Sequence, residues 1–158
     1  MSRPAVRRVL ASEAETVAAG RDLAAALRAG DLLAVDGELG AGKTCLVRGV
    51  AAGLGNDPDA VRSPTFVLHR VYTKGRITLH HIDLYRLGQE ADPGVIDLPS
   101  LLRDGVVAVE WAMYAQLGEF DPVQITIESP DPGQRVLCVD GGAPARIIAA
   151  LTSISAQT

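Results

Sequence analysis

A phosphate-loop pattern constrains the fold of this chain more than any other feature of its sequence. Residues 37–44 read Gly-Glu-Leu-Gly-Ala-Gly-Lys-Thr, which fits the pattern G-x-x-x-x-G-K-[ST]. The apolar run 32–35 precedes the loop, and a helix-compatible run from 44 to 54 follows it. A strand that enters a tight turn and opens a helix directs several backbone N–H groups at one small volume, which favours an anion. The sequence therefore predicts a strand, loop and helix that bind the phosphates of a nucleoside triphosphate.

The residues of this loop have separate expected roles. Gly37, Gly40 and Gly42 allow the backbone to turn sharply and to approach phosphate oxygens that a Cβ atom would keep away. We expect the Lys43 ammonium to reach the β- and γ-phosphates and the Thr44 hydroxyl to ligate Mg²⁺. The residues predicted to contact the nucleotide are Gly37, Glu38, Leu39, Gly40, Ala41, Gly42, Lys43, Thr44, Cys45 and Trp111.

Length and patterning predict one α/β domain over residues 1–158, with a P-loop NTPase-like mixed sheet flanked by helices. The chain has 158 residues, of which 47% are hydrophobic, and this is enough for one sizeable core. A capping box at 12–15 opens an amphipathic run that predicts a helix to Ala29, ended by Gly30. Runs 67–72 and 76–84 predict a β-hairpin. Further strands are predicted at 106–109, 125–128 and 135–139, and further helices at 96–102 and 144–154.

The charge balance argues against a protein that grips nucleic acid by itself. The net charge is −4 and the sequence pI is about 5.3, whereas such proteins usually present a basic face. Arg3, Arg7 and Arg8 form a small basic cluster near the amino terminus, which we interpret as a solvated edge. Contact with nucleic acid through a partner remains compatible with this composition.

Cysteine usage and hydropathy exclude several other classes. Cys45 and Cys138 are far apart in the sequence and form no C-x-x-C pair, so we interpret both as small buried hydrophobic residues. No apolar stretch approaches the ~18 residues of a membrane span, and the amino terminus lacks the apolar core of a signal peptide. We therefore expect a cytoplasmic protein.

Two acids compete for the metal and the attacking water, because transfer or hydrolysis needs both to be positioned. Asp83 ends the run 77–83, which we expect to form a strand beside the phosphate-loop strand. Glu110 directly follows 106–109, a more apolar strand whose end lies where α/β proteins place ligands. We expect Thr44, Asp83 and Glu110 to hold Mg²⁺. The residues alone leave open which acid orients the water.

Three further features point to the same region. Trp111 either covers the nucleotide or closes the core. Thr65, within the run 63–66, occupies the position in which switch-type NTPases place a threonine that meets Mg²⁺ and the γ-phosphate. His80 and His81 are predicted to face opposite sides of their strand, so that one of them faces the site. Zinc is not expected, since neither histidine has a cysteine or an acid at ligand spacing.

Four motifs in register resemble the bacterial TsaE family, which is also called YjeE. They are 37–44, 63–66, 81–87 and 109–111, and the resemblance extends over about residues 12 to 140. It implies a small ATPase that uses ATP and Mg²⁺ to support the formation of N6-threonylcarbamoyladenosine at position 37 of tRNAs that read codons beginning with A. The implied partners are the TsaB and TsaD proteins, with tRNA bound only indirectly through them. The threonylcarbamoyl transfer would belong to the partner complex.

The resemblance also implies roles for individual residues. Lys43 and Thr44 match the contacts to phosphate and Mg²⁺, Asp83 matches a Walker-B-like acid, and Trp111 belongs to a Glu-Trp pair near the nucleotide. The implied catalytic set is Glu110, Asp83 and Thr65. The chain departs from many relatives at 112–113, where Ala-Met stands in place of a second acid, which favours Glu110 as the catalytic acid. Cys45 replaces a common threonine.

Three other classes of P-loop protein are alternatives to this interpretation. A small-molecule kinase usually closes an arginine-bearing lid over the phosphates. Arg62 and Arg103 are available, but no helical lid insertion is visible in the sequence. A GTPase would need an N-K-x-D motif for guanine, which the chain lacks. A nucleotide-gated adaptor with little hydrolysis overlaps with the family interpretation, because an ATPase of that family acts on a partner complex.

Overall fold

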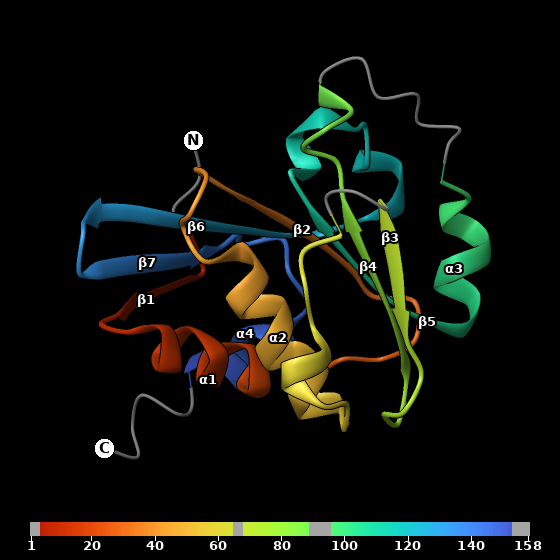
Figure 1. Cartoon of the computed structure of the whole chain (residues 1–158), viewed down its shortest axis with the longest axis horizontal. Helices are drawn as coiled ribbons and strands as arrows, with labels where there is room; N and C mark the ends of the chain where they lie inside the picture. The colour runs from red at the N-terminus through yellow and green to blue at the C-terminus, as the bar shows by residue number, and fades with distance from the viewer. Residues whose placement is uncertain (1–3, 65–67, 89–95, 153–158) are drawn as a thin grey trace.

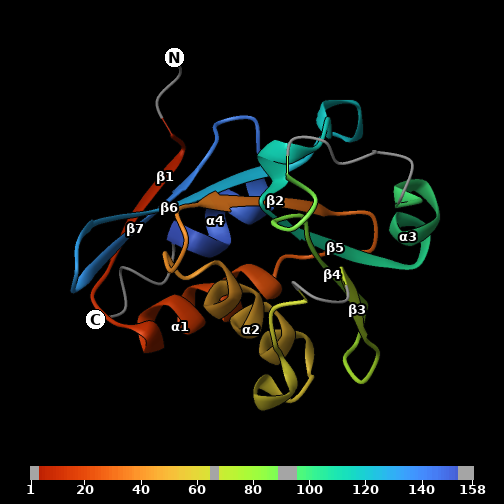
Figure 2. The same cartoon turned by 45° about the horizontal axis from the view of Figure 1, so that its top comes forward.

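The computed structural model describes residues 4–64, 68–88 and 96–152, and these form a seven-stranded sheet between helices (Figures 1 and 2). The strand order is β1-β7-β6-β2-β5-β4-β3. The central strands pair in parallel: β6 (Val123–Asp131), β2 (Leu32–Gly37), β5 (Gly105–Glu110) and β4 (Thr78–Asp83). The outer strands pair antiparallel: β1 (Val6–Leu10), β7 (Gln134–Val139) and β3 (His69–Tyr72). This confirms the predicted α/β fold with a mixed sheet.

Helices cover both faces of the sheet. On one face α1 (Glu13–Ala24) and α2 (Lys43–Leu54) lie side by side, as both views show, with α4 (Ala145–Thr152) against α1. On the other face, α3 (Leu98–Asp104) packs on β5. Two glycines let α1 and α2 approach closely, since a Cβ atom on Gly49 would lie 2.0 Å from the Val17 carbonyl oxygen and one on Gly20 would lie 2.2 Å from that of Leu46. None of the described helices is long and apolar enough to cross a membrane.

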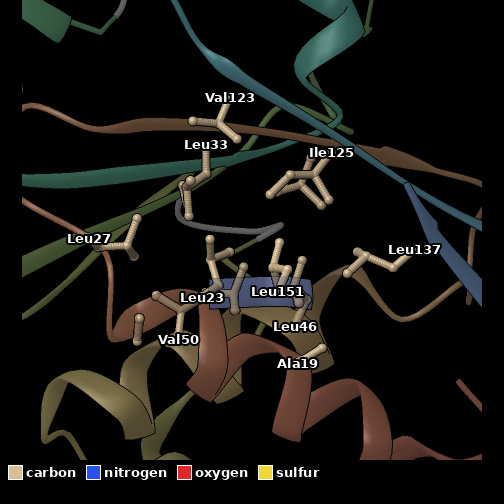
Figure 3. Packing of buried hydrophobic residues seen from close by; sticks show 14 of the residues in the cluster. Ala19, Leu23, Leu27, Leu33, Leu46, Val50, Val123, Ile125, Leu137 and Leu151 are labelled. Atoms are coloured by element: carbon tan, nitrogen blue, oxygen red, sulfur yellow. The ribbon is translucent and has the colours of Figure 1, made fainter. Parts of the chain in front are cut away.

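The core has two parts, one on each side of the sheet. Along β2, Leu33 and Val35 join the larger cluster under α1, α2 and α4, whereas Leu32 and Ala34 join the smaller cluster beneath α3. Figure 3 shows the larger cluster, in which side chains of the sheet such as Leu33 meet helix side chains. Because both faces are covered at the middle of the sheet, β2 and β5 consist mostly of consecutive apolar residues.

The first helix ends earlier than predicted. It stops at Ala24 instead of Ala29, and the following turns are closed by i→i−3 hydrogen bonds. Arg76 Nη2 donates to the carbonyl oxygens of Ala24 (2.6 Å) and Leu27 (3.2 Å), so a distant side chain satisfies carbonyls that a longer helix would have bonded internally. Gly30 adopts a positive φ of 101° in the connection to β2, not at a helix end.

The observed bounds of other helices and strands differ from the predicted bounds by a few residues. The hairpin is confirmed as β3 and β4, although residue 67 lies outside the described part. Helix α3 runs over 98–104 instead of 96–102, with Asp97 as its N-cap and a proline in its first turn. Strand β6 is longer than predicted because its pairing with β7 continues through an irregularity between Glu128 and Asp131.

Candidate functional site

A pocket of about 650 Å³ opens at the carboxyl ends of β2, β4 and β5. The pocket is lined by the phosphate loop with the start of α2, residues 39–45, by residues 10–13, and by residues 132, 133 and 135 at the turn between β6 and β7. The predicted residues Gly37 and Glu38 instead line a smaller hollow of about 430 Å³ on the other side of the loop. The other eight predicted nucleotide contacts all line the main pocket.

The phosphate loop has the backbone that an anion site requires. Gly40 and Gly42 have φ values of 80° and 110°, which residues with a side chain rarely adopt. A Cβ atom on Gly37 would lie 2.5 Å from the Ile127 carbonyl oxygen, so this position also excludes a side chain. Gly42 is the N-cap of α2 and has no side chain to accept from the first turn, which leaves the N–H groups there available to an anion.

The ammonium group of Lys43 is held over the phosphate loop by two carbonyl groups of that loop. Its Nζ donates to the Gly37 oxygen at 2.6 Å and to the Glu38 oxygen at 2.8 Å, and it lies 4.2 Å from the centre of the Trp111 ring. Burial lowers the pKa of this ammonium, while Glu110 and other nearby carboxylates act in the opposite direction. The amine is therefore at the pocket, on contacts that a phosphate group can replace.

Glu110, the last residue of β5, contacts the phosphate loop directly. The Thr44 hydroxyl lies 3.0 Å from each oxygen of the Glu110 carboxylate, which is 2% exposed. Glu110 is in register with Val35 of β2, so its strand is the neighbour of the phosphate-loop strand. A threonine hydroxyl can donate its hydrogen to a carboxylate while its lone pairs face a metal.

Asp83 does not end a strand beside the phosphate-loop strand, so that prediction was wrong. Strand β5 lies between β2 and β4, and Asp83 pairs in register with Glu110. The physical reason is that β5 is buried on both faces and pairs in parallel on both sides, which gives it the inner position. Asp83 still lines the pocket, and it accepts from Ser63 Oγ at 2.7 Å.

Of the remaining predicted catalytic residues, Thr65 lies outside the described residues. Ser63, two residues earlier, lines the pocket and bonds to Asp83, so the loop after α2 reaches the site. The prediction that the two cysteines are buried was wrong. Cys45 and Cys138 are free and partly exposed, and Cys45 lines the pocket, where burial raises the pKa of its thiol.

Trp111 occupies a strained turn at the edge of the pocket. Its backbone is left-handed, with φ 59°, which is uncommon for a large side chain and costs of the order of 1–3 kcal/mol. The ring lies between Tyr85, at 4.9 Å between ring centres, and Tyr114, at 5.7 Å and nearly parallel. The residue lines the pocket and also packs against the smaller core cluster, so both roles considered from the sequence are compatible with its position.

His81 is the histidine that faces the site. It is fully buried, and its Nε2 lies 2.5 Å from Glu110 Oε2. His80 points to the other face, where it bonds to His69 and Asp104. The alternation of side chains along a strand contained this signal, because residues two apart share a face and Asp83, two residues after His81, lines the pocket.

Two residues of the region had no role in the sequence prediction. Arg135, on β7, lines the pocket and donates from Nη2 to the Gly40 oxygen at 3.3 Å. Asp36, just before the loop, accepts from the Met113 N–H at 2.9 Å, and burial raises the pKa of its carboxyl. No sequence motif marks either residue, since Arg135 reaches Gly40 and Asp36 reaches Met113 only through tertiary contacts.

Comparison with known proteins gives consistent matches. The family model "Threonylcarbamoyl adenosine biosynthesis protein TsaE" matches residues 10–137. A TsaE protein of Treponema pallidum is 36% identical over 137 residues, 85% of this chain and 99% of that protein. A TsaE protein of Streptomyces coelicolor is 50% identical over 95 residues, 58% of this chain and 64% of its own length. The crystal structure of Bacillus subtilis YdiB superposes with a TM-score of 0.73 at 27% identity, and the match covers 96% of this chain and 95% of that one.

The fold and the loop define this chain as an α/β protein of the P-loop class, with a mixed sheet whose central strand leads into the phosphate loop. The family match covers most of the chain and includes every predicted site residue. The chain belongs to the TsaE family. The curated relatives named above are tRNA threonylcarbamoyladenosine biosynthesis proteins.

Proposed function

We propose that this protein is a cytoplasmic ATPase that binds ATP with Mg²⁺ in the pocket. We propose further that it supports the TsaB–TsaD complex in forming N6-threonylcarbamoyladenosine at position 37 of tRNAs that read codons beginning with A. The observation that carries the proposal is the contact between Thr44 and Glu110, which brings a buried acid to the first turn of the phosphate-binding helix. Family membership supplies the biosynthetic context.

The charges of the pocket support a requirement for a divalent cation. Among the described residues that line it, Lys43 and Arg135 are cationic, whereas Glu13, Asp83 and Glu110 are acidic. A nucleoside triphosphate would therefore enter a site in which carboxylates outnumber cations. When bound, Mg²⁺ would offset this repulsion and neutralise charge on the phosphates.

The residues fit Mg²⁺ as a metal held jointly with a substrate. Thr44 and Glu110 offer oxygen ligands side by side, and Asp83 follows on the next strand. Magnesium usually takes one or two protein oxygens together with waters and phosphate. The described residues contain no cluster of three or more His, Cys, Asp or Glu side chains that could hold a metal by themselves, and this agrees with such a shared site.

The chain's own groups divide the chemistry of hydrolysis. The open first turn of α2 and Lys43 bind and orient the phosphates, with Lys43 exchanging its two carbonyl partners for phosphate oxygens. Glu110 accepts a hydrogen bond at the end of β5, and in this proposal it would take a proton from the attacking water. Asp83 and Ser63, which bond to each other, would respond to the γ-phosphate. The part of Thr65 in this response is proposed from the sequence alone, since Thr65 lies outside the described residues.

The composition favours a helper that does not bind tRNA on its own. Arg8 is neutralised by an ion pair with Asp22 at 2.8 Å, so the small basic cluster at the amino terminus is reduced further. A net charge of −4 does not favour binding to the phosphates of a nucleic acid. In this proposal the partner proteins provide the contact with tRNA.

Lys43→Ala tests the nucleotide site. A charge-assisted hydrogen bond contributes about 1.5–3 kcal/mol, so ATP binding measured by calorimetry with Mg²⁺ should weaken by roughly tenfold or more. Modification of tRNA reconstituted with TsaB and TsaD should be lost. Lys74→Ala is the matched control, because Lys74 is the other lysine of the chain and is exposed far from the pocket.

Two outcomes would contradict the proposal. One is equal ATP affinity for the Lys43→Ala and Lys74→Ala proteins. The other is a wild-type protein that hydrolyses no ATP, alone or with TsaB and TsaD. Phosphate transfer to a metabolite in a pool of small molecules would instead indicate a kinase.

A further inference from the structure

The side chain of His81 has a single hydrogen-bond partner among the described residues, and that partner is the carboxylate of Glu110. Its Nε2 lies 2.5 Å from Glu110 Oε2, and a carboxylate oxygen can only accept, so Nε2 carries the hydrogen. In the parallel register His81 is opposite Ala108, two residues before Glu110, so the contact runs diagonally across the two strands. The side chains of both residues are at most 3% exposed.

The other ring nitrogen distinguishes His81 from a histidine that only stabilises the fold. Among the residues that the structure describes, Nδ1 of His81 is buried with no hydrogen-bond partner, whereas His80 uses both of its ring nitrogens, one on His69 and one on Asp104. An unsatisfied buried polar atom costs about 1–3 kcal/mol. An apolar side chain would avoid that cost, so the reason for a histidine at this position lies in the bond to Glu110.

The hydrogen bond from His81 restricts the Glu110 carboxylate. Among the described residues this carboxylate has one other donor, the Thr44 hydroxyl. Thr44 has a single hydroxyl hydrogen, which lies within reach of both oxygens and therefore does not select one orientation of the carboxylate. The His81 ring approaches Oε2 alone. With Oε2 bound to the ring, Oε1 is the oxygen left to Thr44 and to a molecule in the pocket.

We propose that His81 is a positioning residue for Glu110, and that its Nε2–H holds the carboxylate in the one orientation in which Oε1 can accept the proton of the attacking water. This inference rests on the proposed function, since it assigns Glu110 a role in hydrolysis. It needs only the hydrogen bond itself, and no change in the charge of the ring.

The main test is steady-state hydrolysis by the full-length protein with TsaB and TsaD. His81→Ala should lower kcat by about 10–100-fold, the range found when the partner that orients a functional ligand is removed. KM for MgATP should stay within about twofold, because the phosphate contacts are unchanged. His81→Gln should recover most of the rate, since its side-chain amide can donate from nearly the same place as Nε2.

The matched control is His80→Ala. His80 is the adjacent residue on the same strand and is also buried, but it faces away from the pocket. It should leave kcat and KM unchanged. Thermal melting of each variant separates loss of fold from loss of rate, and His81→Gln keeps the test valid if His81→Ala does not fold.

A double mutant tests whether His81 acts through Glu110. If it does, His81→Ala combined with Glu110→Gln should be no slower than Glu110→Gln alone. A further loss on adding His81→Ala would overturn the proposal. So would a His81→Ala enzyme with the wild-type kcat, or a His81→Gln enzyme as slow as His81→Ala.

An NMR measurement keeps this inference separate from the proposed function. The His81 Nε2–H should give a downfield, slowly exchanging proton resonance that shifts with Glu110→Gln and not with Asp104→Asn. Absence of that resonance would overturn the role of His81 even in an active ATPase. Its presence in a protein that hydrolyses no ATP would sustain the hydrogen bond and overturn the proposed function together with the role in hydrolysis.

Discussion

Strand β4 presents two consecutive histidines to opposite faces of the sheet, and their surroundings differ sharply. His81 faces α2 and contacts Glu110 in a fully buried setting. His80 faces the side of α3 and contacts Asp104, whose side chain is 69% exposed. A shift of one residue along a strand reverses the face, so two identical side chains receive different roles.

The same contrast holds for the two faces as a whole. On the α2 face the carboxyl ends of the strands carry buried polar groups that meet the phosphate loop, among them Asp83 and Glu110. On the α3 face the same strands contribute apolar side chains such as Ile82 and Val109 to the smaller core cluster. One face therefore carries the chemistry, and the other stabilises the sheet that positions it.

The largest effect should come from the acid on the α2 face. Glu110→Gln keeps the shape of the side chain but removes a base, so kcat for ATP hydrolysis should fall by about 10²–10⁴-fold. Asp104→Asn is the equivalent change on the α3 face and should leave the rate unchanged, because the Asp104 side chain is 69% exposed and its contact with His80 lies away from the pocket. Equal losses of kcat in the two variants, measured with the TsaB–TsaD complex, would show that the two faces do not differ in their role in hydrolysis.

Substitutions in the core should distinguish the two faces of the sheet less strongly, through their effect on the free energy of unfolding. Leu33 and Leu32 are adjacent in β2, each is 1% exposed, and they enter the larger and the smaller cluster respectively. Truncating a buried leucine to alanine typically costs about 2–5 kcal/mol, and less where neighbours can relax into the space. We expect Leu33→Ala to lie near the upper end and Leu32→Ala near the lower end, because α3 is a single short helix.

Chemical denaturation of the two leucine variants measures this difference. A larger loss for Leu32→Ala would show that the α3 face is the more tightly packed one. Wild-type ATP affinity in both variants would confirm that neither substitution acts on the site.

The smallest expected effect is a pH dependence of stability caused by His69, which lies on the edge strand β3. Burial, and to a lesser extent His80, lower the pKa of His69 below its ordinary value of 6.5. The unfolded chain then takes up a proton at a higher pH than the native state. Stability from this group is therefore fully present above about pH 6.5 and declines as the pH falls towards the native pKa.

Denaturation of His69→Gln between pH 5 and 8 checks the sign. The variant should show a flatter loss of stability on the acidic side than the wild type, with little difference at pH 8. A steeper acidic loss in the variant would mean that the native state favours the protonated ring.

Local patterns predicted most of the structure correctly. The phosphate loop, the hairpin of β3 and β4 and the mixed sheet all follow from short stretches whose periodicity or glycine placement is explicit. The end of α1 could not be predicted, because Arg76 donates to the carbonyl of its last residue, Ala24, from 52 positions away in the sequence. The glycine contacts between α1 and α2 were missed for a similar reason, since helix-interior Gly20 and Gly49 acquire meaning only when the helices cross.

The sequence by itself determined that this chain has a strand, a phosphate loop and a helix, and that Asp83 and Glu110 end two strands near it. Those are local properties of backbone and periodicity. Only the tertiary structure decided that Glu110 is the acid on the neighbouring strand and that His81 holds it. Strand order and contacts across strands depend on which apolar runs are buried on both faces, and this is a property of the whole sheet that no single motif contains.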